Sequence, residues 1–189
     1  MTTQTPTTTD LIDLFTIRLE AVGGHVHRVA GSIAAAGVIG TLAAGAVEPT
    51  AWISAEVADR APDLVATLTA AGVTIRIPET PGEVRDQPLG VGIAEAAIAE
   101  TGSVIMVEPA IPSRSVTLMT ETLAIICAIE SILPSLDEAT SVLRAISTDG
   151  AAYATFVTGP SRTADIERQL TVGVQGPGVF HVILVDRLT

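Results

Sequence analysis

The chain has 189 residues, a formal net charge of −11 and a single cysteine. This length fits one domain with one hydrophobic core. An acidic chain without a concentrated basic patch cannot neutralise the phosphate backbone of a nucleic acid, so nucleic acid is excluded as a partner. All ten basic residues are arginine, which also excludes a lysine Schiff base and the lysine of a Walker-type phosphate loop.

Membrane spans, secretion signals and redox centres are not expected either. No apolar run reaches the roughly 20 residues that cross a bilayer, and residues 1–10 lack the basic and apolar regions of a signal peptide. We expect a short disordered lead-in over 1–10 and a single domain over 11–189. Cys127 lies in an apolar run and is expected to fill core space. One cysteine cannot hold an iron–sulfur cluster, which needs about four thiolates, so electron transfer requires another chain.

The first 80 residues alternate between helical and strand patterns. Apolar residues at helical spacing follow Asp10, a good N-cap, and Gly23-Gly24 ends this first helix. Short β-branched runs and alanine-rich stretches then predict a strand over 25–29, a helix over 32–44, a strand over 52–54, a helix over 61–71 and a strand over 73–77. This alternation implies right-handed crossovers and a largely parallel sheet with helices on both faces.

The pattern changes after the Pro/Gly-rich connection over 78–90. Residues 91–99 and 103–108 leave no room for a crossover helix between them and predict a β ribbon, although 95–100 also fits a helix. We then expect a loop over 108–113, a central strand over 123–129, a helix from Pro134 to about Ser147, a strand over 153–157, a helix over 163–170 and a last strand over 179–185.

A glycine turn between a predicted strand and a predicted helix marks the stretch 158–167. At the carboxyl edge of a parallel sheet, its backbone amides and the helix dipole would bind a phosphate or carboxylate, with Arg162 adding donors. The alternative is a plain helix cap in which Ser161 or Thr163 satisfies the helix amides. The candidate ligand-binding residues here are Gly159, Pro160, Ser161, Arg162 and Thr163.

A second candidate is the glycine turn that carries Glu100. A carboxylate at the mouth of a sheet acts as a base or nucleophile when burial raises its pKa toward neutrality. The alternative is a solvated turn residue. We therefore take Glu100 as the candidate catalytic residue, and Thr101, Gly102 and Ser103 as candidate ligand-binding residues.

Two further patterns are weaker. His25 and His27 face the same side of a predicted strand, a spacing that suits a metal, but the third histidine, His181, lies in the last strand and no acidic or cysteine cluster accompanies it. No metal site is predicted. The glycine-rich run 173–178 follows a predicted helix and precedes a strand, which is the wrong order for a dinucleotide cradle, so a helix-to-strand connection is expected.

The runs 98–104, 156–167 and 173–177, with 181–184, resemble the LUD-domain family and, within it, the lactate utilization protein C group. The resemblance implies a three-layer α/β/α sandwich with a mostly parallel mixed sheet, similar to the ribose-phosphate isomerase, glucosamine-phosphate deaminase and CoA-transferase group. It also implies a cytosolic, iron–sulfur-free component of L-lactate oxidation to pyruvate, with iron–sulfur partner proteins and no cofactor of its own. A small anionic ligand would lie between Glu100 and residues 159–163.

Two other functions remain open. One is an independent enzyme of the same fold group that acts on a phosphorylated, CoA-linked or folate-like substrate, with Glu100 as its catalytic carboxylate. The other is a structural partner without a small-molecule site. The chain departs from the family where Thr122 and Gln175 replace histidines that are often present and Gly178 replaces a basic residue, while Glu95 replaces a common aspartate. The lost histidines weaken the expectation of a catalyst acting alone.

Overall fold

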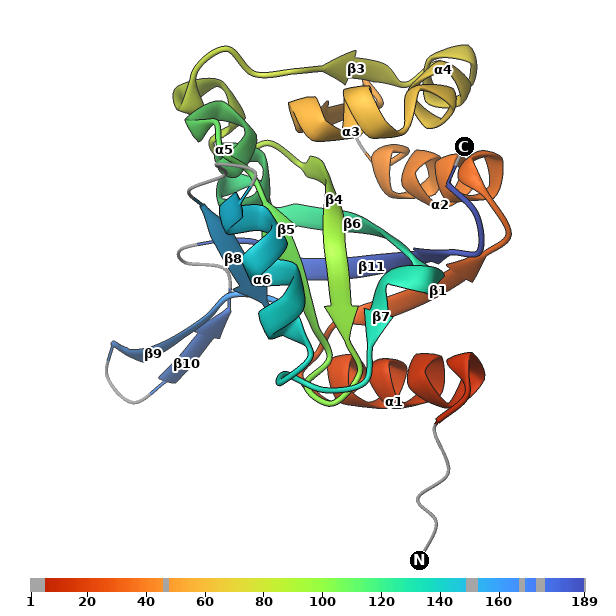
Figure 1. The fold of residues 1–189 in the computed structure, drawn as a ribbon. Coiled ribbons are helices and arrows are strands. Elements are labelled where there is room, and N and C mark those ends of the chain that lie inside the picture. Colours follow the sequence, from red (N-terminus) through yellow and green to blue (C-terminus); the bar gives the residue numbers. More distant parts are fainter. Residues whose placement is uncertain (1–5, 46–47, 149–152, 167–168, 173–175, 189) are drawn as a thin grey trace, which may run out of the picture.

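The computed structural model describes residues 6–45, 48–148, 153–166, 169–172 and 176–188, and Figure 1 shows a mixed sheet enclosed by helices. The first helix, α1 (Thr8–Ala21), begins earlier than predicted, because Thr7 is the N-cap and Asp10 completes a capping box with it. Phe15 and Leu19 are fully buried on the inner face of α1. None of the described helices is long and apolar enough to cross a membrane.

Parallel strands form the main sheet, in the order β1-β11-β6-β4-β2-β3. Their bounds are β1 (His25–Val29), β11 (Val179–Val185), β6 (Thr122–Ala128), β4 (Leu89–Ile98), β2 (Thr50–Ile53) and β3 (Thr74–Arg76). The register places His25 opposite His181 and Val179 opposite Thr122. Residues 123–127 of β6 are fully buried, as expected of a central strand covered on both faces.

The predicted β ribbon is confirmed. β4 turns into the antiparallel strand β5 (Ser103–Val107), with Ile98 opposite Ser103, so residues 95–98 are strand and not helix. The short strand β7 (Ile132–Leu133) pairs with the end of β4, and β8 (Ala154–Val157) extends the ribbon beyond β5.

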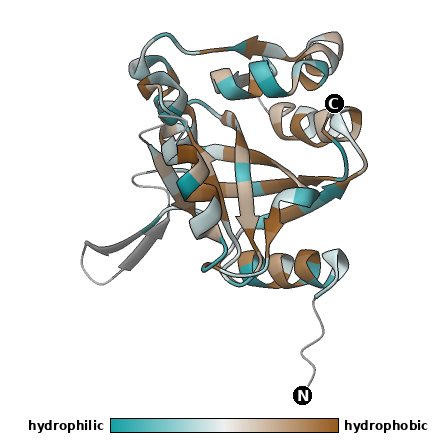
Figure 2. Cartoon of the chain, in the orientation of Figure 1, coloured by the Kyte–Doolittle hydropathy of each residue, from teal (hydrophilic) through white to brown (hydrophobic). Residues whose placement is uncertain are grey.

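Helices cover both faces of the sheet, which confirms the three-layer α/β/α prediction (Figure 1). α2 (Ser32–Ala43) and α4 (Pro62–Ala70) pack on one apolar cluster, and α1 packs on a second cluster on the opposite face. α6 (Ala139–Thr148) packs on the outer side of the ribbon. Figure 2 shows that the strands between these layers are mostly hydrophobic, which is where burial contributes most to stability.

Two of the described α-helices were not predicted. α3 (Ala55–Arg60) fills the link between β2 and α4, and α5 (Ile111–Met119) occupies part of the predicted loop over 108–113. Pro112 lies in the first turn of α5, where proline is favoured because no intrahelical N–H bond is lost there. Reading that proline as a loop marker was wrong. α6 also begins later than predicted, at Ala139 and not at Pro134.

The predicted helix over 163–170 is wrong. The chain forms two antiparallel strands instead, β9 (Arg162–Ile166) and β10 (Gln169–Val172). Thr163, Ile166, Thr171 and Val172 in this segment favour an extended backbone. The acidic residues that suggested the start of a helix also occur in hairpins. Whether the segment forms a helix or a hairpin depends on the pairing of β9 with β10, which the spacing of residues along the chain does not reveal.

Candidate functional site

Glu100 lies in the turn between β4 and β5, and its side chain is exposed. Its Oε2 accepts a hydrogen bond of 2.9 Å from the N–H of Leu136. Its own N–H donates to the carbonyl of Pro134 at 3.1 Å. Both contacts are with main-chain groups, and together they hold the chain after β7 against this turn.

The two sequence-predicted segments do meet. Thr101 Oγ1 donates to Ser103 Oγ at 2.8 Å, and Ser103 Oγ is 2.7 Å from Thr158 Oγ1. Gly102 has a φ of 67° and lies against α1, so that a Cβ on it would come within 2.5 Å of the backbone nitrogen of Leu19. This chain of hydroxyl groups therefore joins the β4–β5 turn to the end of β8 beneath α1.

The turn around Gly159 lies at the amino ends of β1 and β11. The N–H of Ser161 donates to the carbonyl of Pro177 at 2.8 Å, just before β11. The guanidinium of Arg162 donates to the carbonyl of Val22, which closes α1 just before β1 begins. The expected position at the carboxyl edge of the sheet, in front of a helix, is wrong.

That correction changes the electrostatics of the predicted anion site. The strand β9, and not a helix, begins at Arg162, so no helix dipole supports an anion at this turn. Arg162 instead places its positive charge at the C-terminal end of α1, where partial negative charge accumulates. Pro160 packs near Gly23, and Thr163 pairs with Thr171 in the β9–β10 hairpin. The predicted helix-to-strand connection over 173–178 is likewise wrong, since it follows β10; residues 173–175 lie outside the described ranges.

All three histidines of the chain come together, which the sequence did not predict. The parallel pairing of β1 with β11 places His27 Nε2 3.0 Å from His181 Nδ1. The ring of His25 stacks on that of His181, with centroids 4.8 Å apart. Burial, and then the charges of His25 and His27, lower the pKa of His181 to about 4. Burial also lowers the pKa of His27.

A buried acid that sequence reasoning missed is Glu108, which is only 2 % exposed. Both carboxylate oxygens lie within hydrogen-bond distance of Thr117 Oγ1, at 2.5 and 2.6 Å. Burial is the main cause that raises the pKa of Glu108 to about 7, and the charge of Glu56 adds to it. Arg114 donates to the main-chain carbonyls of Glu108 and Pro109, at 2.9 and 2.6 Å.

Two more polar atoms lie near this acid. Ser54 Oγ and Glu56 Oε2 are buried and have no hydrogen-bond partner among the described residues. Ser54 follows β2, and the β2–β4 register continued by one residue places it opposite Gly92. A Cβ added to Gly92 would lie 3.9 Å from Glu108 Oε1. No sequence motif marks this group, because its burial depends on α3 and α5 packing over the start of β4.

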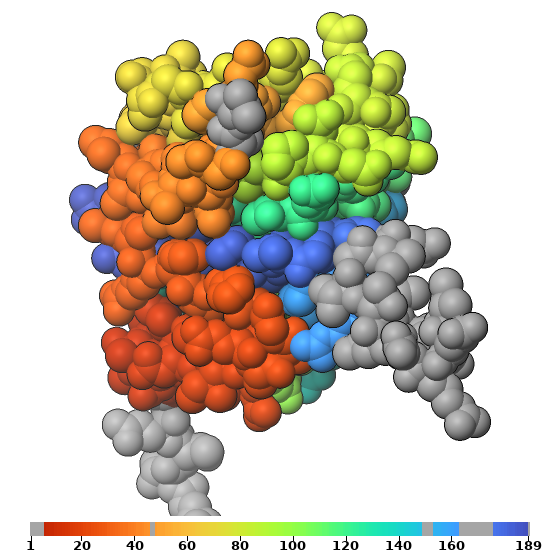
Figure 3. Space-filling model, turned by 180° about the vertical axis from the view of Figure 1, so that it is seen from behind, coloured from red at the N-terminus to blue at the C-terminus, as the bar shows by residue number. Residues whose placement is uncertain are grey.

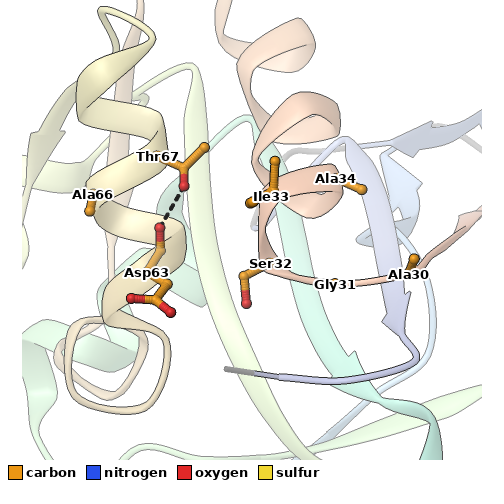
Figure 4. A pocket seen from close by; sticks show the side chains of 8 residues that line it. All are labelled: Ala30, Gly31, Ser32, Ile33, Ala34, Asp63, Ala66 and Thr67. Carbon is orange, nitrogen blue, oxygen red and sulfur yellow. Dashed lines mark hydrogen bonds between the residues drawn. The ribbon is translucent and has the colours of Figure 1, made fainter.

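A pocket of about 600 Å³ opens at the carboxyl end of β1, between the first turn of α2 and α4 (Figure 4). Ligands of open α/β sheets bind outside the carboxyl ends of the strands. Small side chains leave the space free, and Asp63 and Ser32 lie on opposite walls. The lining residues are Ala30, Gly31, Ser32, Ile33, Ala34, Asp63, Ala66 and Thr67.

Comparisons with known proteins agree with this architecture. "Lactate utilization protein C 1" of Bacillus mycoides is 37% identical over 101 residues, which cover 52% of this chain and 43% of that protein. "Lactate utilization protein C" of Bacillus subtilis is 35% identical over 101 residues, covering 52% and 42%. The match therefore spans less than half the length of these relatives.

A solved structure supports the fold. The crystal structure of a DUF162 family protein from Deinococcus radiodurans superposes with a TM-score of 0.65 at 17% identity, covering 96% of this chain and 99% of that one. The model of the LUD domain matches residues 12–185, from α1 to the end of β11. Because that match takes in nearly every element described above, the chain belongs to the LUD-domain family.

Proposed function

We propose that this chain acts in the utilization of L-lactate as a component without an iron–sulfur cluster, beside iron–sulfur proteins that carry the electrons. The names of the relatives support the pathway. Membership of the LUD-domain family supports the same assignment. Oxidation of L-lactate to pyruvate releases two electrons and two protons, so an electron acceptor must take part.

The observation that supports electron transfer through another protein is the burial of Cys127. This single cysteine of the chain is fully buried in β6. Burial raises the pKa of its thiol to about 11, so the thiol stays protonated at neutral pH and is a poor metal ligand. A cluster needs about four thiolates. The chain therefore cannot hold one by itself, and the electrons of this proposal pass to another protein.

The small anionic ligand of this proposal has two candidate positions. The pocket between α2 and α4 has the volume of a small-molecule site and lies at the carboxyl end of β1. The turn at Gly159 offers the exposed guanidinium of Arg162, already bonded on one side to Val22. Two variants separate them: Ala66→Trp fills the pocket, and Arg162→Gln removes the cation from the turn.

Ligand binding is measured as the thermal stabilisation that L-lactate or pyruvate gives to the purified chain, since binding to the native state raises apparent stability. We expect Ala66→Trp to abolish this shift and Arg162→Gln to retain it. The reverse result would place the ligand at the turn. Absence of any shift in the unmodified chain would remove the ligand from the proposal.

The function itself is tested by deleting the gene in its native host. We expect growth on L-lactate to be lost and growth on pyruvate to be kept, because pyruvate enters after the oxidation step. A plasmid copy should restore growth. Unchanged growth on L-lactate would refute the proposal.

The partnership is tested by a pull-down of the tagged chain from cells grown on L-lactate. We expect iron and acid-labile sulfide in the eluate, together with lactate-dependent dye reduction. The same chain purified from a heterologous host should carry neither iron nor activity. Dye reduction by that isolated chain would show that it oxidises lactate without iron–sulfur partners.

A further inference from the structure

The histidine cluster joins two strands that are distant in sequence. His27 Nε2 and His181 Nδ1 face each other at 3.0 Å across the β1–β11 pair. Two imidazole nitrogens bound to one zinc ion at about 2.05 Å lie roughly 3.3 Å apart in a tetrahedral site. The two nitrogens now share a hydrogen bond. They would hold an ion after a separation of a few tenths of an ångström and a turn of the rings that aims both lone pairs at one point.

The charge state of the pair suits a metal ion. A ligating imidazole must be neutral, with a free lone pair. Burial lowers the pKa of both His27 and His181, so both rings are neutral at pH 7. One ring nitrogen now donates its proton to the other. When an ion binds, that proton moves to the other nitrogen of its own ring, so both facing nitrogens present lone pairs and both rings stay neutral.

His25, the third histidine, does not point at the space between His27 and His181. The His25 ring stacks on His181 with an interplanar angle of 24°, so it lies against the face of the His181 ring rather than in line with its nitrogens. No three histidine, cysteine or acidic side chains converge on one point in the described ranges. The pair thus offers two nitrogens, and the remaining coordination positions are left for water or for oxygen donors of a ligand.

The pair is also within reach of solvent. His25 is exposed and His27 half-buried, while His181 is 8 % exposed. Figure 3 shows residues of β11, in deep blue, at the surface between the orange-red N-terminal elements and the teal β6 segment. An ion can therefore approach from the β1 side without opening the core.

We propose that His27 and His181 form a two-nitrogen chelate for a divalent transition-metal ion of the zinc class. Imidazole is the ligand that zinc, nickel and copper share, whereas magnesium and calcium prefer oxygen. This proposal is independent of the proposed function, because metal binding is measured on the isolated chain.

Titration of the metal-free, untagged chain tests the proposal, with Co²⁺ followed by visible absorption and Zn²⁺ by calorimetry. We expect one ion per chain and a rise in Tm with Zn²⁺. His27→Gln and His181→Gln should each weaken binding by about 10-fold or more. His25→Gln is the matched control and should bind within about threefold of the unmodified chain, since its ring does not point at the ion.

Two results would overturn the proposal. One is the absence of any Co²⁺ spectrum or Zn²⁺ heat in a chain that circular dichroism shows to be folded. The other is equal loss of binding in all three variants, which would indicate loose binding to a histidine-rich surface and no chelate between β1 and β11.

Discussion

At the scale of single residues, Glu108 is the most perturbed acid of the described chain. It lies behind α5 with Thr117 on its carboxyl group, and burial raises its pKa from 4.5 to about 7. A neutral carboxyl group in that place costs less than a buried carboxylate. Between pH 4.5 and 7 the folded state therefore keeps a proton that the unfolded state releases.

This difference in proton binding predicts a pH dependence. The contribution of Glu108 to stability is complete below pH 4.5 and is lost as the pH rises through 7. Glu108→Gln mimics the neutral acid and does not titrate. We measure the free energy of unfolding of both proteins in urea and take the value of the variant minus that of the unmodified chain. We expect this difference to be up to about 3 kcal/mol more positive at pH 8 than at pH 5.

Glu83→Gln provides the control for that experiment. Glu83 is fully exposed and its hydrogen bond to Thr80 lowers its pKa, so it is ionised across the whole interval. The free energy of unfolding of Glu83→Gln should differ from that of the unmodified chain by the same amount at pH 5 and at pH 8. A similarly flat difference for Glu108→Gln would show that Glu108 is ionised in the folded state.

At the scale of elements, the contact between α1 and the β4–β5 turn decides how the predicted site segments are placed. Gly102 approaches the backbone of Arg18 and Leu19 so closely that no side chain fits between them. The pairing of β5 with β8, with Val104 opposite Val157, brings Ser103 beside Thr158. The β4–β5 turn therefore supports the docking of α1.

Gly102→Ala tests this packing. Its φ of 67° makes alanine strained, and its Cβ would meet Leu19 N at 2.5 Å. Gly72→Ala is the control, because Gly72 has a φ of 84° but nothing within 4 Å of the added carbon. We expect both variants to pay about 1–2 kcal/mol for the backbone strain, and Gly102→Ala to lose at least about 2 kcal/mol more through the clash. Equal losses in the free energy of unfolding, measured in urea, would show that α1 shifts to make room for the added carbon.

At the scale of the whole molecule, a net charge of −11 is spread over 189 residues. Among the described residues, Arg28 pairs with Asp186 and Arg60 with Glu95, and both ion pairs are about half exposed. Exposed pairs contribute little to stability. Repulsion among the remaining carboxylates therefore dominates the surface electrostatics, and it is screened by salt.

Salt should accordingly stabilise the protein at neutral pH. We expect Tm at pH 7.5 to rise by about 2–4 °C between 20 and 300 mM NaCl, which corresponds to roughly 1 kcal/mol for a chain of this size. At pH 4.5, near the sequence pI of about 4.5, the same addition should have little effect. A fall in Tm with salt at pH 7.5, measured by calorimetry, would mean that attractive pairs outweigh the repulsion.

Sequence patterns alone determined the class of fold. Alternating β-branched and alanine-rich stretches predicted the parallel strands and the helices between them, and the all-apolar run over 123–129 predicted the central strand β6. The turn at Glu100 was predicted to join two strands, and it does. These features are local, since the period of the apolar residues and the turn residues beside them report directly on the backbone.

Only the tertiary structure decided which titratable side chains meet and which are buried. His181 meets His27 because β11 pairs with β1 across 154 residues of sequence, and Glu108 is buried where Thr117 of α5 meets its carboxyl group. The segment after Gly159 became a hairpin and not a helix, at the amino edge of the sheet and not the carboxyl edge. Strand order, desolvation and hairpin pairing depend on residues far apart in the chain, and no local pattern encodes them.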